Sequence, residues 1–237
     1  MKKIFRAFVP FIAEVTHDFM LTACMLGPIL TGMAFRFMVP FAEAFLCEYF
    51  DAVQILAPYY IIFDLLLAIM TPILFCFAGV LVILEELDCD VAKYYAVTPI
   101  GRSGYLLSRI GMPTVASLLY NIVLLCIFSI SGIDFFMLIL LSISGGLIAV
   151  ITSLLVVSFA KNKMEGMALV KLCGILMIGV PAACFVSGPM RYLFGILPSF
   201  WMAELCLTKN YWYFLLSVIT SCLMLGGLYG KFKKKLL

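Results

Sequence analysis

The sequence predicts an all-α membrane protein with six transmembrane helices in a single domain covering residues 1–237. Hydrophobic residues make up 65% of the chain and charged residues only 12%, and a soluble fold has too little interior to bury that much apolar surface. Crossing about 30 Å of hydrocarbon takes roughly 20 helical residues, and the apolar runs of this chain reach that length. The predicted spans cover residues of about 19–41, 57–84, 105–131, 135–160, 169–188 and 212–230.

Residues 1–18 predict an amphipathic helix that lies on the inner membrane surface. Its apolar residues recur at helical spacing, while most of the charged residues fall elsewhere around the helix. The apolar residues are Ile4, Phe8, Phe11, Ile12 and Val15.

A second interfacial segment is predicted between the first two spans, on the outer leaflet. An aromatic and aliphatic stripe runs from Phe45 to Val53, with Glu43, Glu48 and Asp51 as acidic companions. Segments of this composition lie in the plane of the interface.

The stretch between the fifth and sixth spans predicts a broken, re-entrant outer segment. Pro189, Arg191, Pro198 and Glu204 interrupt it, and residues 193–203 between the interruptions are too short to cross a bilayer.

The distribution of basic residues predicts that both termini lie in the cytoplasm. With six crossings, all but three of the 16 Lys and Arg residues fall on one side, and the positive-inside rule makes that side the inner one. The outer exceptions are Arg36, Arg191 and Lys209. Both tryptophans, Trp201 and Trp212, fall at the outer boundary, where amphipathic rings favour headgroup depth.

The chain lacks the residues that an enzyme or a metal protein needs. Its single histidine is His17, and its nine cysteines are scattered singly. There is no P-loop sequence for nucleotide binding and no basic stripe for nucleic acid. We therefore expect no catalytic residue, no metal site and no cofactor. Small residues around Gly145 and around Gly226 are explained by close helix packing.

The inner loop carries a family resemblance. It contains Glu85-Glu86, then Thr98-Pro99, then the run Tyr105-Leu-Leu-Ser-Arg109 that opens the third span. Together with the six spans and the broken outer segment, these residues resemble the permease subunit of a bacterial type-2 ABC transporter, within the exporter group that includes fluoroquinolone and other drug exporters. The chain departs from that pattern at Asp88-Cys89-Asp90, which is more acidic than in many relatives.

The resemblance implies partners and a division of labour. Two permease subunits, identical or different, would face each other in the bacterial plasma membrane, and a separate cytoplasmic ABC ATPase would hold ATP and Mg²⁺. Residues 85–97 would form the coupling helix that docks on this ATPase. The coupling residues would be Glu85, Glu86, Asp88, Asp90, Lys93, Thr98 and Pro99.

The acidic residues of the loop support such a docking role independently of the resemblance. A carboxylate-rich helix end is repelled by anionic lipid, whereas a basic rim on a soluble partner would satisfy it. The alternative interpretation is a helix end that is simply solvated.

Two charged residues fall inside predicted spans. An acid at the depth of Asp64 costs about 2.5 to 3.5 kcal/mol on the insertion scale, so a partner is expected. Arg36 can reach a comparable depth, and the sequence predicts an Arg36–Asp64 pair or, alternatively, separate snorkelling to the outer surface. Asp64 or Arg191 contacting a charged substrate is the functional alternative.

The predicted function is export of a small amphipathic compound, a drug, an antimicrobial peptide or a lipid, powered by the separate ATPase. The alternative is a stand-alone secondary transporter driven by an ion gradient. Such carriers usually show inverted repeats and ionisable groups at the membrane midplane, and this sequence offers only Asp64.

Overall fold

The computed structural model describes residues 18–89 and 107–236, and their regular structure is entirely helical. The predicted interfacial helix before Asp18 and the part of the predicted coupling helix after Cys89 lie outside these residues. The helices are α2 (Phe19–Phe50), η1 (Ala57–Tyr59), α3 (Tyr60–Asp88), η2 (Leu107–Gly111), α6 (Met112–Phe128), α7 (Phe135–Phe159), α8 (Lys163–Cys173), η3 (Gly174–Met177), α9 (Gly179–Phe185), η4 (Pro189–Ile196), α10 (Pro198–Thr208) and α11 (Trp212–Leu236).

Five helical stretches are long and apolar enough to cross a membrane, and α11 adds a shorter apolar helix over Trp212–Leu228. The five stretches are Phe19–Phe50, Ala57–Asp88, Leu107–Phe128, Phe135–Phe159 and Lys163–Phe185. Each predicted span therefore corresponds to a helix or to a continuous succession of helical segments.

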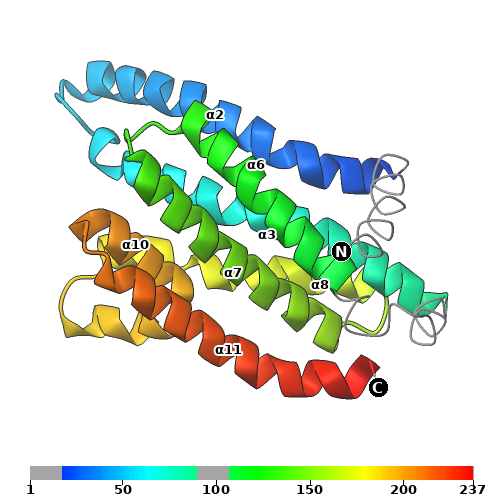
Figure 1. The fold of residues 1–237 in the computed structure, drawn as a ribbon. Helices are drawn as coiled ribbons and strands as arrows, with labels where there is room; N and C mark the ends of the chain where they lie inside the picture. The colour runs from blue at the N-terminus through cyan, green and yellow to red at the C-terminus, as the bar shows by residue number, and fades with distance from the viewer. Residues whose placement is uncertain (1–17, 90–106, 237) are drawn as a thin grey trace.

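The long helices alternate in direction along the bundle (Figure 1). The start of α2, the end of α3, the start of α8 and the end of α11 lie together on the right of the figure; we call this the Asp18 end, after the residue that precedes α2. The end of α2, the start of α7, η4 and α10 lie at the opposite end, which we call the Asp51 end.

Helix α3 forms the centre of the bundle. In its most apolar stretch 78% of the residues are buried inside the protein, against 11% for α2. It packs against α2, α6, α7 and α8, and an apolar sequence all round the helix suits this position. Helix α2 is peripheral, and its apolar residues, such as Phe37 and Phe41, face outward.

The first helix is longer than the sequence predicts. The predicted separate stripe after residue 41 is part of α2, which continues through Pro40 to Phe50. Membrane helices tolerate proline because the freed backbone group is satisfied locally. The chain turns only after Asp51, where the Glu43 carboxylate accepts hydrogen bonds from the backbone N–H groups of Ile55 (2.9 Å) and Leu56.

The fifth membrane-length stretch begins earlier than predicted, at Lys163 and not near residue 169. Asn162 caps it, since its side-chain oxygen accepts the backbone N–H of Glu165 over 2.8 Å. The sequence-based boundary was wrong because this first turn is polar, whereas the apolar run starts one turn later. The helix then tightens at Gly174–Met177 and ends at Phe185.

The broken segment predicted between the last two spans is present as two short helices, η4 and α10. A single extended residue, Leu197, separates them, because Pro198 disfavours a helical conformation in the residue before it. Helix α10 packs against α9 and α11 and fills the Asp51 end of the bundle with buried residues, Phe200 among them.

Candidate functional site

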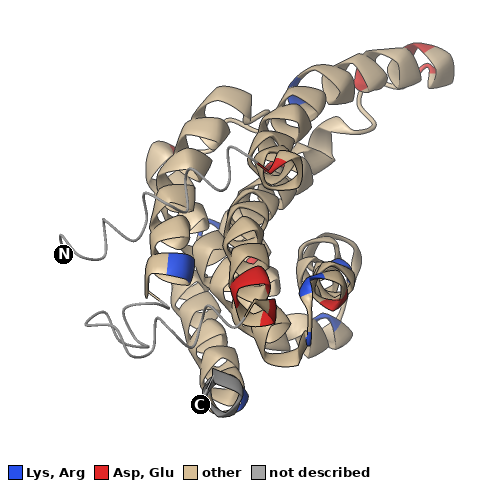
Figure 2. Cartoon of the chain, turned by 90° about the vertical axis from the view of Figure 1, so that its right-hand side faces the viewer, with Lys and Arg blue, Asp and Glu red and all other residues tan. Residues whose placement is uncertain are grey.

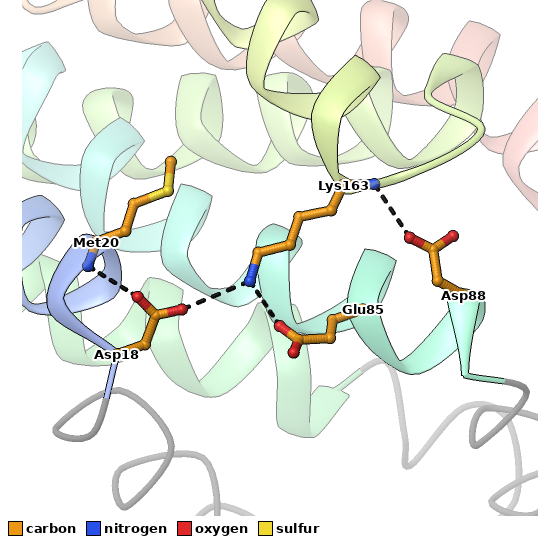
Figure 3. A network of polar contacts seen from close by, with 5 residues as sticks. All are labelled: Asp18, Met20, Glu85, Asp88 and Lys163. Atoms are coloured by element: carbon orange, nitrogen blue, oxygen red, sulfur yellow. Dashed lines mark hydrogen bonds and ion pairs between the residues drawn. The ribbon is translucent and has the colours of Figure 1, made fainter.

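Lys163 joins three helices at the Asp18 end (Figure 3). Its ammonium Nζ lies 2.7 Å from Oε2 of Glu85 on α3 and 3.5 Å from Oδ2 of Asp18 before α2. Its backbone N–H donates to Oδ2 of Asp88 over 3.2 Å. Exposed ion pairs are each worth only about 0 to 1 kcal/mol, but this network places the start of α2, the end of α3 and the start of α8 in one fixed arrangement.

Asp18 begins α2 as its N-cap residue. Its Oδ1 accepts the backbone N–H of Met20 over 2.8 Å, which satisfies one of the free donors of the first helical turn. This bond and the positive charge of Lys163 hold the pKa of the Asp18 carboxyl below its ordinary value, while partial burial acts in the opposite direction. Asp18 is therefore stabilised as a carboxylate.

Beside this network, Glu86 of α3 and Arg109 of η2 form a buried ion pair. Arg109 donates from Nε to Oε2 of Glu86 over 3.2 Å and from Nη2 to Oε1, which makes the contact bidentate. The Arg109 and Glu86 side chains are only 4% and 10% exposed. Such pairs carry geometric specificity as well as energy. The pair joins the residues on either side of the segment 90–106.

The backbone of η2 lies directly against α3 at this level. A side chain at Gly79 of α3 would collide with the carbonyl oxygen of Arg109. The contact falls where the chain makes a π-helical turn over Leu107–Gly111 before it continues as α6. Turns of this kind often occur at functional sites in helices.

The predicted coupling residues divide into two groups. Asp90, Lys93, Thr98 and Pro99 lie outside the described residues. The other three, Glu85, Glu86 and Asp88, all make contacts within the chain: Glu85 and Asp88 bind Lys163, and Glu86 binds Arg109. These three carboxylates fix the helices around the segment 90–106, so within the single chain they are anchoring residues. Figure 2 faces this end of the molecule and shows acidic residues near the centre of a largely uncharged bundle.

At the Asp51 end, Asp64 of α3 organises the turn between α6 and α7. Its side chain accepts the hydroxyl of Ser129 at 2.9 Å, the backbone N–H of Ile130 at 3.0 Å, and both the backbone N–H, at 2.9 Å, and the hydroxyl of Ser131. Asp64 is 1% exposed. A buried carboxylate requires donors of this kind, and the turn supplies them.

The predicted Arg36–Asp64 ion pair is wrong. Arg36 donates from Nη1 to the backbone carbonyl of Ser129 over 2.9 Å, so the two charged residues bind the same turn from different sides. The backbone N–H groups that follow the end of α6 have no helical partner and donate to the Asp64 carboxylate. The carbonyl of Ser129 accepts from the Arg36 guanidinium instead. The sequence correctly placed Arg36 and Asp64 near each other but predicted the wrong binding partner for each.

Arg191 forms the second buried contact at this end. Its Nη2 donates to Oε1 of Glu204 on α10, whose side chain is 5% exposed. Trp201 donates from Nε1 to the carbonyl of Gly195 over 2.7 Å. These contacts fasten η4 onto α10, so Arg191 serves the packing of the broken segment in this structure.

Three partners were missed as site residues by the sequence reasoning: Arg109, Lys163 and Glu204. Each pairs with a residue that the sequence had singled out. A general rule could have found them, because an ionisable residue near the end of a span needs an opposite charge at similar depth on a neighbouring helix. The sequence alone could not show which helices are neighbours.

Asn121 of α6 is a further buried polar residue without an exposed surface. Its side-chain Nδ2 donates to the carbonyl of Ala68 on α3 over 3.0 Å and lies 3.3 Å from Oγ of Ser142 on α7. Such contacts connect helices inside a membrane. Among residues 18–89 and 107–236, no group of three or more His, Cys, Asp or Glu residues is placed to hold a metal ion.

Comparison with known proteins identifies the family. Residues 11–229 match a family model described as fluoroquinolones export permease protein Rv2686c-like. The chain belongs to this family. Two curated relatives are the fluoroquinolones export permease proteins MT2760 and Rv2686c of Mycobacterium tuberculosis, from strains CDC 1551 / Oshkosh and ATCC 25618 / H37Rv. Each is 28% identical over 196 residues, which cover 79% of this chain and 75% of the relative. No solved structure matches.

Membership of an export permease family, together with several helices of membrane-spanning length, makes this chain a multi-pass membrane protein. The matched residues include both sides of the segment 90–106 and therefore the Glu86–Arg109 pair. The drug-export permease resemblance drawn from the sequence is confirmed at the level of the family.

Proposed function

We propose that this export permease is the membrane subunit of an ATP-driven ABC exporter, with the Asp18 end in the cytoplasm and the Asp51 end outside. The excess of Lys and Arg on the loops and termini assigned to the Asp18 end supports this orientation. The chain itself is non-catalytic, and a separate ATPase holds ATP and Mg²⁺. A second permease subunit completes the exporter.

The Glu86–Arg109 pair is the observation that carries this proposal. Glu86 of α3 and Arg109 of η2 lie on either side of the segment 90–106 in the sequence, and the buried pair fixes these two flanking positions to each other. A segment held rigidly at its base transmits a displacement to the helices it joins, as a docking element for a motor protein must. Residues 85–97 then serve as the coupling helix, with Glu85, Glu86 and Asp88 as its anchors.

The cargo in this proposal is a small amphipathic compound that leaves the cytoplasm or the inner leaflet. The relatives are named for the export of fluoroquinolones, so a fluoroquinolone is the first compound to test. The Arg191 side chain is 29% exposed, but its contact with Glu204 already neutralises its charge, so a charged group of the cargo would compete with Glu204 for it.

Reconstitution in vesicles tests this function. The full chain is co-purified with its ATPase, and efflux of a fluorescent fluoroquinolone is measured with ATP and with a non-hydrolysable analogue. We expect efflux with ATP and no efflux with the non-hydrolysable analogue. In the Glu86→Gln variant we expect ATP-stimulated efflux to be lost even where the ATPase still binds. Efflux by the chain without any ATPase, driven by a proton or sodium gradient, would establish the secondary transporter instead.

A further inference from the structure

An acidic and a basic side chain at the Asp51 end line the same small hollow but do not form an ion pair with each other. Asp134, which precedes α7, and Lys209, which ends α10, both line a hollow of about 90 Å³ together with Ser131 and Cys206. Within the described part of the chain, neither charged side chain makes a hydrogen bond or an ion pair, and Asp134 does not cap α7 with its carboxylate. An unneutralised acid and an unneutralised base therefore share one site.

The same lysine also lines a second, larger groove. This groove has a volume of about 630 Å³ and runs between α7 and the start of α11. Its walls are mainly apolar and aromatic: Phe136, Leu140, Tyr211, Trp212 and Phe214. Lys209 is thus the boundary between a charged hollow and an apolar groove.

We infer that this site binds a zwitterionic phospholipid with a primary ammonium headgroup, of the phosphatidylethanolamine type. The lipid phosphate contacts Lys209, the ammonium contacts Asp134, and one acyl chain lies in the groove. An ammonium with N–H donors forms a charge-assisted hydrogen bond to a carboxylate. The hollow, at about 90 Å³, is small beside the neighbouring groove, which suits a small headgroup amine.

The surroundings favour a lipid over a soluble ligand. Trp212 is 72% exposed and Tyr211 is 56% exposed at the mouth of the groove. Aromatic side chains of this kind lie at headgroup depth in membrane proteins. The charges select the headgroup, because an anionic lipid without an amine would bring its phosphate near Asp134 with no group to satisfy that carboxylate. The inference requires a membrane-embedded chain and holds with or without an ATPase partner.

Native mass spectrometry of the full chain in detergent tests the site. Phosphatidylethanolamine and phosphatidylglycerol with identical acyl chains are added separately, and the lipid-bound fractions are compared. We expect the wild-type chain to bind phosphatidylethanolamine about fivefold more strongly, the magnitude of one favourable charge contact at a membrane surface. Lys209→Gln should lower the binding of both lipids, whereas Asp134→Asn should remove the preference and leave phosphatidylglycerol binding unchanged or stronger.

Matched controls come from the same chain. Asp51→Asn removes another exposed acid at this end, and Lys161→Gln removes an exposed base at the other end; both should leave the preference intact. Because the Asp134 side chain makes no capping hydrogen bond, Asp134→Asn removes no contact within the chain and is compatible with folding of α7. Equal binding of the two lipids by the wild-type chain overturns the inference, and so does an unchanged preference in Asp134→Asn. Loss of a dimer in Lys209→Gln without any change in lipid binding also overturns it, because the groove would then be a contact between two copies.

Discussion

Glu86 and Arg109, 23 positions apart in the sequence, are joined side chain to side chain almost out of contact with solvent. Glu86 lies two residues before the end of α3 at Asp88, and Arg109 lies in the π turn that leads into α6. The backbone of Arg109 also lies against Gly79, so the guanidinium approaches α3 from a fixed position. The pair links the two sides of the segment 90–106.

The first prediction concerns the stability supplied by this pair. Glu86→Gln leaves the positive charge of Arg109 without its carboxylate in a buried site, which we expect to lower the free energy of unfolding by about 3 to 5 kcal/mol. The measurement is thermal or denaturant unfolding of the purified chain in detergent.

Glu85→Gln is the matched control, because the Glu85 side chain is 47% exposed and its contact with Lys163 is worth at most about 1 kcal/mol. A second test combines Glu86→Arg with Arg109→Glu, which should recover part of the loss. Equal effects of Glu85→Gln and Glu86→Gln would contradict the assignment of Glu86 as the buried anchor.

The second prediction concerns Asp64. Asp64→Ala leaves the N–H groups of Ile130 and Ser131 without their acceptor, and we expect a loss of about 2 to 4 kcal/mol, since hydrogen bonds to charged groups are worth about 1.5 to 3 kcal/mol each and water replaces some of them. Arg36→Ala should cost less than about 1 kcal/mol, because its bond to Ser129 is exposed.

The Arg36→Asp, Asp64→Arg double variant separates the two interpretations of this region. The structure predicts that it stays as unstable as Asp64→Arg alone, since the turn needs an acceptor at residue 64 and a charge at residue 36 cannot provide it. Rescue by the double variant, measured as expression level and melting temperature in detergent, would restore the direct ion pair.

Length and hydropathy were sufficient to predict the helical architecture. The ranges 57–84, 135–160 and 212–230 each contain most of an observed helix, because a run of apolar residues in a membrane has few alternatives to a helix. Local chemistry set the ends that were missed. The Asn162 cap places one start about six residues earlier than predicted, and α2 continues to Phe50, past residue 41 where the first span was predicted to end.

The polar contacts were less predictable than the helices. Periodicity shows that Asp64 and Glu86 need partners, but choosing the partner requires knowing which helix packs against α3 and at which depth. Backbone groups also compete with side chains: Asp64 binds N–H groups of a turn that no charge pattern reveals. Arg109 belonged to the recognised motif, yet its contact with Glu86 depends on how η2 packs against α3.

The third prediction compares two glycines. In Gly145→Ala the new methyl group would collide with the carbonyl oxygen of Ala68 on α3, so α7 would have to move away. Overpacking of this kind costs about 1 to 3 kcal/mol. Gly227→Ala is the control, because no atom of the described chain lies within 4 Å of the added carbon. It should be neutral or stabilising by up to about 1 kcal/mol through helix propensity. Unfolding in detergent measures both, and a destabilised Gly227→Ala would indicate that α11 packs closely in the assembled protein.

The fourth prediction concerns pH. The pKa of Asp18 is lowered by the bond from Met20 and by Lys163, so the folded state favours the carboxylate. The stabilisation is complete above the ordinary Asp pKa of about 3.9 and is lost as the pH falls below it, because the proton then binds the unfolded chain first.

Asp18→Asn keeps an acceptor for the cap but cannot titrate. Its stability deficit relative to the wild type should therefore be a few tenths of a kcal/mol to about 1 kcal/mol at pH 6, since the group is partly exposed, and should shrink as the pH falls below the ordinary Asp pKa. Melting temperatures of the two proteins in the same detergent across this range provide the measurement, and a deficit that stays constant with pH would show that the carboxylate charge contributes nothing.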